Sequence, residues 1–175
     1  MVLSFSSFSA VGFSGSRSLS GVPFFRCVSL AGSAVAAGCA VSTGCAAGAD
    51  AAARAGACGS VQVFSVASGR WGVGRGAFAG RSAAFVRSLA GSAAPLLVSF
   101  PSGACPTGLV LGRQWASGFG SGSWAGVALA AGLGVSVVVF LPAGVSPPTG
   151  WGAWVSVSGG LLAGGWLLRP APSLF

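Results

Sequence analysis

Short runs of β-favouring residues alternate along this chain with longer alanine-rich stretches, and glycine or serine separates one from the next. Such alternation is typical of β-α-β units, in which helices connect parallel strands. A chain of 175 residues, 53% of them hydrophobic, is long enough to bury the core of one such domain and short for two. The pattern therefore predicts one domain of the α/β class.

The runs divide the chain into nine expected elements. Strands are predicted at residues 9–14, 40–43, 61–66, 95–100 and 135–140, and helices at residues 22–37, 50–57, 77–89 and 124–133. Asp50 is predicted to be the N-cap of its helix. We expect a Rossmann-like open, mainly parallel sheet with strand order 3-2-1-4-5 and helices on both faces.

The chain changes composition after residue 141, where proline, glycine and tryptophan become frequent. We therefore divide it into a main α/β domain, residues 1–141, and an irregular C-terminal extension, residues 142–175. Tryptophans are expected to pack this extension onto the domain.

An uncharged apolar run at residues 124–141 permits another interpretation, because about 18 such residues have the length of a membrane-spanning helix. Its pattern favours a helix, a turn at Gly134 and a buried β-branched strand that ends before Pro142. The N-terminus has no basic segment before an uninterrupted apolar stretch, so no signal peptide is expected. We predict a cytoplasmic protein with no membrane partner, and keep a small membrane protein as an alternative.

The charge of the chain is strongly one-sided, with nine arginines, no lysine and a single acid, Asp50, giving a net charge of +8. Residues encoded with adenine at the second codon position are almost all missing, so an adenine-poor coding strand accounts for much of this composition. A non-functional reading frame is a further alternative for the same reason. The charge nevertheless favours an anionic partner, whether phosphate, nucleic acid or anionic lipid.

The five cysteines do not form a metal-binding pattern. Their number is odd, none belongs to a CxxC pair, and the chain has no histidine. We expect small buried thiols in a reducing compartment, with no metal and no cofactor.

Three glycine-rich segments follow predicted strands and precede predicted helices: residues 15–17, 44–50 and 118–123. In an open parallel sheet these positions meet at the carboxyl edge, where backbone N–H groups and helix N-termini bind phosphate. Arg17 adds a guanidinium that can bind the same anion through two hydrogen bonds. The predicted ligand-binding residues, including two from the helix at 77–89, are Gly15, Ser16, Arg17, Gly44, Gly48, Asp50, Arg81, Ser82, Gly120, Ser121, Gly122 and Ser123.

Five segments match the order of a known family: GFSGSR (12–17), STGCAAGADAAAR (42–54), GRSAA (80–84), LLVSF (96–100) and GSGSWAGVALAAGLGVSVVVF (120–140). Together they resemble the SLOG superfamily of Rossmann-like domains, which includes the DNA-processing protein A and "lonely guy" phosphoribohydrolase families. The resemblance covers residues 9–141 and is closest to uncharacterised members with a GSR motif. It implies nucleotides or nucleotide-derived ligands at the glycine-rich loops.

The chain departs from the phosphoribohydrolase pattern PGGxGTxxE, because Gly118 and Phe119 replace its first two residues and Gly126 replaces its glutamate. Related proteins with Arg-Asn before the fourth strand differ here too, since this chain has Arg81-Ser82. Neither histidine nor glutamate is present, so acid-base chemistry would depend on Asp50 or a cysteine. Whether the chain is an enzyme stays open, and the residues favour a non-catalytic protein.

The sequence predicts a binding protein for an anionic, nucleotide-derived small molecule, such as one like ADP-ribose. A single-stranded DNA- or RNA-binding protein is the main alternative, because arginines and tryptophans together can bind phosphates and stack on bases. The sequence leaves the oligomeric state open.

Overall fold

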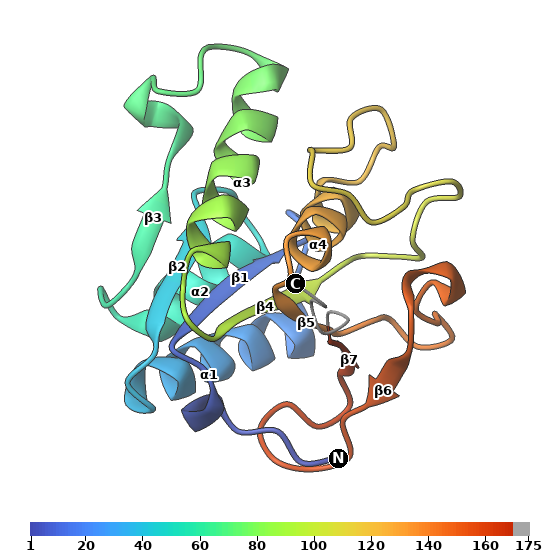
Figure 1. Cartoon of the computed structure of the whole chain (residues 1–175). Coiled ribbons are helices and arrows are strands. Elements are labelled where there is room, and N and C mark those ends of the chain that lie inside the picture. Colours follow the sequence, from blue (N-terminus) through green and yellow to red (C-terminus); the bar gives the residue numbers. More distant parts are fainter. Residues whose placement is uncertain (170–175) are drawn as a thin grey trace.

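A seven-stranded sheet runs through the computed structural model, which describes residues 1–169 (Figure 1). Its strands are β1 (Ala10–Gly15), β2 (Ala40–Gly44), β3 (Gln62–Phe64), β4 (Pro95–Phe100), β5 (Ser136–Val139), β6 (Trp154–Ser156) and β7 (Trp166–Leu168). The order is β3-β2-β1-β4-β5-β7-β6, and the first five strands are parallel. The chain has a Rossmann-like open α/β fold, and the predicted order 3-2-1-4-5 is confirmed.

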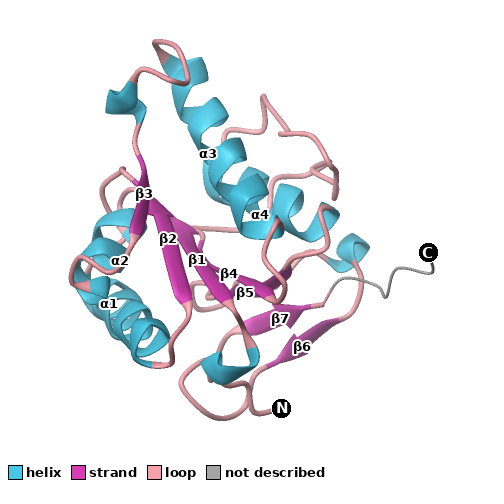
Figure 2. Cartoon of the chain, turned by 60° about the vertical axis from the view of Figure 1, so that its left-hand side comes forward, coloured by secondary structure: helices cyan, strands magenta, loops and turns pink. Residues whose placement is uncertain are grey.

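Two helices cover each face of the sheet, as Figure 2 shows. On one face lie α1 (Gly21–Ala36) and α2 (Ala49–Ala57), and on the other lie α3 (Arg75–Ala90) and α4 (Gly122–Gly132). Strand β4 supplies both cores, because its successive side chains point to opposite faces: Val98 packs with α1 and α2, and Leu97 with α3 and α4. The continuous apolar run of this strand is therefore required by burial on both faces.

Helix α3 lies unusually close to β1, and Gly12 permits this approach. A Cβ atom at Gly12 would lie 2.6 Å from Leu89 Cδ2 and 2.8 Å from Phe85 Cζ. Because interiors are densely packed, a side chain at this position would force the Leu89 and Phe85 side chains to move.

Local hydrogen bonds place some element ends differently from the predictions. Strand β3 ends at Phe64 because the Ser65 side chain accepts a hydrogen bond from Ala67 N–H and starts the 3₁₀ turn Val66–Ser68. Helix α4 begins at Gly122, after the N-cap Ser121. The N-cap of α2 is Gly48, so the prediction that Asp50 caps this helix is wrong; Asp50 lies in its first turn.

The C-terminal extension is not irregular throughout its described part. Residues 154–156 and 166–168 form β6 and β7, which pair antiparallel with each other, and β7 also pairs antiparallel with β5. Their β-favouring triplets are short, and they become strands because β7 pairs with the edge of β5 and β6 pairs in turn with β7. Trp151 is buried as expected and packs edge-on against Trp124. Residues 170–175 of the predicted extension lie outside the described residues.

The apolar run at 124–141 is divided between α4 and β5. Gly134, at φ 86°, makes the turn between them, which is a conformation that other residues rarely adopt. Within residues 1–169, no helix has the length and hydropathy needed to cross a membrane.

Candidate functional site

A cavity of about 440 Å³ opens at the carboxyl edge of the sheet, beside the ends of β1 and β4. At this point the chain leaves β1 toward α1 on one face and leaves β4 toward α4 on the other, which is where open α/β sheets bind ligands. Ten of the twelve predicted residues line it: Gly15, Ser16, Arg17, Asp50, Arg81, Ser82, Gly120, Ser121, Gly122 and Ser123. The predicted convergence of these loops is confirmed, and their binding role stays a prediction.

The other two predicted residues, Gly44 and Gly48, support the cavity from behind. Gly48 has φ +67°, and a Cβ atom on it would collide with the carbonyl oxygen of Ser16. The neighbouring Ala49 N–H donates to that same oxygen at 3.0 Å. Gly48 therefore lets the start of α2 lie directly against the loop that follows β1.

The loop after β1 is also fixed to β4. Ser16 N–H donates to the Phe100 carbonyl at 2.9 Å, and a Cβ atom at Gly15 would lie 2.7 Å from that carbonyl oxygen. These contacts hold Ser16 and Arg17 at the mouth of the cavity. Hydrogen bonds between backbone groups therefore define this wall.

Asp50 and Arg81 form a buried ion pair on the cavity wall. Arg81 Nη1 lies 3.1 Å from Asp50 Oδ2, and the two residues are only 5% and 6% exposed respectively. Ala46 N–H also donates to Asp50 Oδ2 at 3.1 Å, and Thr43 Oγ1 lies 3.5 Å from Oδ1. The Thr43 hydroxyl donates its proton to the Phe13 carbonyl at 2.8 Å, so the carboxylate is held mainly at Oδ2, by Arg81 and the Ala46 N–H.

Arg81 has hydrogen-bonding capacity left over. Its Nε is buried and has no hydrogen-bond partner among the described residues, although the side chain lines the cavity. A guanidinium can donate through Nε and a terminal nitrogen to two oxygens of one anion. A buried donor without a hydrogen-bond partner destabilises the folded protein unless a bound ligand accepts its hydrogen bond.

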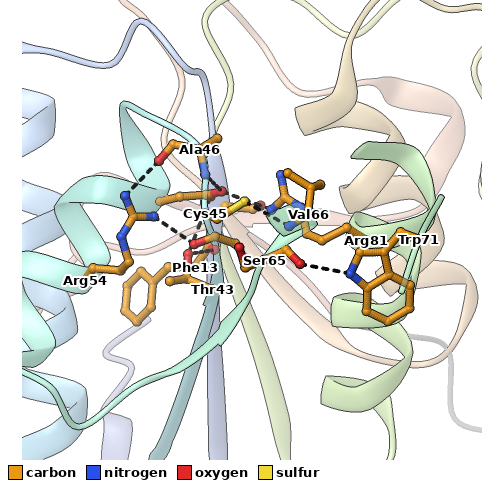
Figure 3. A network of polar contacts seen from close by, with 12 residues as sticks. Phe13, Thr43, Cys45, Ala46, Arg54, Ser65, Val66, Trp71 and Arg81 are labelled. Atoms are coloured by element: carbon orange, nitrogen blue, oxygen red, sulfur yellow. Dashed lines mark hydrogen bonds and ion pairs between the residues drawn. The ribbon is translucent and has the colours of Figure 1, made fainter. Parts of the chain in front are cut away.

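Gly44, the last residue of β2, provides the space for this ion pair. A Cβ atom at Gly44 would overlap Arg81 Nη1 and Asp50 Oδ2. Its backbone is held as well, since Arg54 Nη1 donates to the Gly44 carbonyl at 2.8 Å and Arg54 Nη2 to the Ala46 carbonyl at 3.1 Å. Figure 3 shows Arg54 and Arg81 reaching this loop from opposite sides.

Arg17 lies at the open side of the cavity. Its side chain is exposed, and its Cζ lies 4.6 Å from the ring centroid of Phe78 on α3. This cation–π contact connects the β1 loop to α3. The charged residues that line the cavity are Arg17, Arg81 and Asp50, so their net charge is +1.

The N-terminus of α4 forms the opposite wall. Ser121 Oγ accepts a hydrogen bond from Trp124 N–H at 3.3 Å, and Ala125 N–H bonds to the Ser121 carbonyl. The N–H groups of Gly122 and Ser123 precede the first intrahelical bond, and the helix dipole makes this end positive. Both residues line the cavity, where these groups favour an anion.

Sequence reasoning missed several residues of the site. Arg54 holds the β2 loop, and its position four residues after Asp50 was the available signal, because such residues share a helix face. Ser102 and Trp115 come from the irregular segment between β4 and α4, for which no periodicity predicts an orientation. The remaining wall residues not predicted are Ser14, Ala46, Phe85, Val86 and Gly126.

The cysteines do not add chemistry to this cavity. All five are free thiols, and residues 1–169 contain no cluster of three or more Cys, His, Asp or Glu that could hold a metal ion. Burial, and to a smaller extent the nearby Asp50 carboxylate, raises the pKa of Cys27 to about 12. Cys27 is therefore a protonated, unreactive core residue.

No known protein family matches this chain, and no curated protein or solved structure is significantly similar to it.

Proposed function

We propose that this chain binds a phosphate-bearing, nucleotide-derived small molecule in the cavity at the ends of β1 and β4. The observation that carries the proposal is Arg81: it lines the cavity, it is nearly inaccessible to solvent, and its Nε lacks a partner within the described chain. An oxyanion seated there would accept the hydrogen bond that the protein leaves unmade.

The surrounding groups suit a ligand that carries both a phosphate and hydroxyl groups. The first N–H groups of α4 and the Arg17 guanidinium bind phosphate oxygens, and serine hydroxyls at positions 82, 102 and 123 also line the cavity. The volume of about 440 Å³ is in the range of small-ligand pockets. A sugar phosphate or mononucleotide therefore fits in size and in chemistry.

Membership of the SLOG superfamily is part of this proposal. Its support is that the GSR, GCAAGAD and GSGS segments lie at strand ends and helix starts around one cavity or directly behind it. We propose binding and not catalysis, because the sequence has no histidine or glutamate and its single acid is engaged by Arg81. Five free thiols fit a reducing compartment, which supports the cytoplasm as its location.

The test is calorimetric titration of the protein with ribose 5-phosphate and with AMP. We expect binding that Arg81→Lys weakens by about tenfold or more, because lysine keeps the charge but loses the planar pair of donors. Arg70→Ala is the control, since Arg70 is an exposed arginine that does not line the cavity. No binding by the wild-type protein, or equal affinity in Arg81→Lys, would contradict the proposal.

A further inference from the structure

A second cavity of about 370 Å³ lies on the α1 side of the same sheet edge. Most of its lining is apolar, in contrast to the serine-rich first cavity. The residues that form its walls include Leu19, Ser20, Pro23, Arg26, Phe100 and Phe140.

The two cavities meet at Ser16 and Ser102, which line both. Ser16 follows β1 and Ser102 follows β4, and the two loops are joined by the hydrogen bond from Ser16 N–H to the Phe100 carbonyl. These residues therefore form a ridge at the point where the chain turns to opposite faces of the sheet. Because both cavities are lined by these two residues, they adjoin each other at this edge of the sheet.

The far wall of the second cavity is a fixed aromatic stack. Phe100 and Phe140 lie 4.9 Å apart with an interplanar angle of 15°, and Arg26 Cζ lies 4.4 Å from the Phe140 ring centroid. Arg26 also donates a hydrogen bond to the Ala163 carbonyl, so its guanidinium is held in place. Phe100 and Phe140 are only 1% and 9% exposed, so the group that this wall offers to a ligand is the Arg26 guanidinium held against them. A planar guanidinium can stack on a flat, electron-rich ring.

Helix α1 begins beside the ridge, and its first turn has backbone N–H groups at Gly21 and Val22 but none at Pro23. Its N-cap, Ser20, makes no side-chain capping hydrogen bond, and the helix has 16 residues, enough for a full dipole. Beside the helix start, the hydroxyls of Ser16 and Ser18 form a hydrogen bond of 2.8 Å with each other.

We propose that the second cavity binds the nucleobase half of a two-part ligand. Arg81 holds the sugar phosphate of the same ligand in the first cavity. The ligand class is a nucleoside diphosphate sugar such as ADP-ribose, with its diphosphate crossing the ridge of Ser16 and Ser102. This inference rests on the proposed function, because it assumes that the first cavity binds the sugar phosphate.

The test compares ADP-ribose with ribose 5-phosphate by calorimetric titration. In the wild-type protein, ADP-ribose is expected to bind at least about tenfold more tightly than ribose 5-phosphate, because only ADP-ribose reaches the second cavity. Ser20→Trp places a large side chain in that cavity without removing a capping bond. This variant should lose the advantage of ADP-ribose and keep the wild-type affinity for ribose 5-phosphate.

Two further variants make the result unambiguous. Ser29→Trp changes an exposed residue of α1 that lines neither cavity, and it should behave as wild type. Arg26→Met keeps an apolar side chain near Phe140 but removes the charge, and it should reduce the ADP-ribose advantage alone.

The outcomes separate this inference from the function on which it rests. If neither compound binds, the proposed function fails. If ribose 5-phosphate binds in an Arg81-dependent way and ADP-ribose binds no more tightly, only the second-cavity inference is overturned. An ADP-ribose advantage that Ser20→Trp leaves intact would overturn it as well.

Discussion

The guanidinium of Arg81 occupies the space that the β-carbon of residue 44 would fill if that residue were not glycine. The two residues are far apart in the sequence, one at the end of β2 and the other in the middle of α3. Gly44 does not lie in the left-handed region of backbone conformation, so its requirement for glycine is purely a matter of space. The orientation of Arg81 toward the cavity therefore depends on a missing side chain on a neighbouring strand.

Gly44→Ala is expected to lower the free energy of unfolding by about 1–3 kcal/mol, the usual effect of overfilling a packed site. It should also weaken ribose 5-phosphate binding, because the Arg81 guanidinium must move. Gly76→Ala is the matched control: no atom lies within 4 Å of its added Cβ, and alanine in a helix favours stability by up to about 1 kcal/mol over glycine. Urea unfolding of both variants checks the prediction, and an unchanged stability in Gly44→Ala would contradict it.

The ion pair between Asp50 and Arg81 is expected to behave as a coupled unit. Asp50→Asn or Arg81→Met alone leaves one buried charge without its partner, which typically destabilises by about 3–5 kcal/mol. The double variant removes both charges and should lose clearly less stability than the sum of the two single variants. A double-mutant cycle from denaturant unfolding measures this coupling, and additive effects would show that the pair does not act together.

Arg17→Ala is expected to weaken phosphate-ligand binding by about 2 kcal/mol, the scale of a charge-assisted hydrogen bond at a partly accessible site. Stability should change little, because Arg17 is exposed and contributes mainly a surface cation–π contact with Phe78. Titration calorimetry and thermal unfolding on the same samples separate these effects. A large loss of stability with unchanged affinity would assign Arg17 a structural role instead.

Cys27 is expected to make the fold sensitive to alkali. Its pKa is raised from 9.0 in the unfolded chain to about 12 in the folded one, chiefly by burial and then by the Asp50 carboxylate. The stabilising effect of the protonated thiol is complete below pH 9 and is lost as the pH rises toward 12. Unfolding measurements should show this decline, and Cys27→Ala should reduce it. In the native protein an alkylating reagent should modify the exposed Cys58 well before Cys27.

The net charge of +8 predicts an electrostatic association with single-stranded nucleic acid that is distinct from ligand binding. Affinity for an oligothymidylate should fall steeply between about 50 and 200 mM salt, and Arg75→Ala should lessen that dependence. Trp71 is less available for stacking than the sequence indicates, because its indole N–H donates to the Ser65 carbonyl and Arg70 lies near its ring. Salt-dependent affinity that Trp71→Ala also weakens would favour the nucleic-acid hypothesis. Binding that ignores salt, or no binding at micromolar protein, would exclude it.

The alternation of β-favouring and alanine-rich segments was enough to predict the five parallel strands, the four helices and their order. Each of these elements has a local signal, and chirality and short connections leave few topologies for such a series. The same topology placed Arg17 and the Gly120–Ser123 segment at one cavity, because the carboxyl ends of neighbouring parallel strands share an edge. Placement of these loops was therefore accessible from the sequence.

Only the tertiary structure decided which residues of different elements meet, because the local sequence pattern does not encode these contacts. Asp50 has the residue type and position of a helix cap, yet it is the partner of Arg81, because α3 packs closely enough on β1 and β2 to bring a guanidinium to the start of α2. The triplets of β6 and β7 are too short to predict alone, and they are strands because β7 pairs with β5 and β6 pairs with β7. Periodicity determines which face of an element is buried, whereas the meeting of particular side chains depends on distances set by the packing of the whole chain.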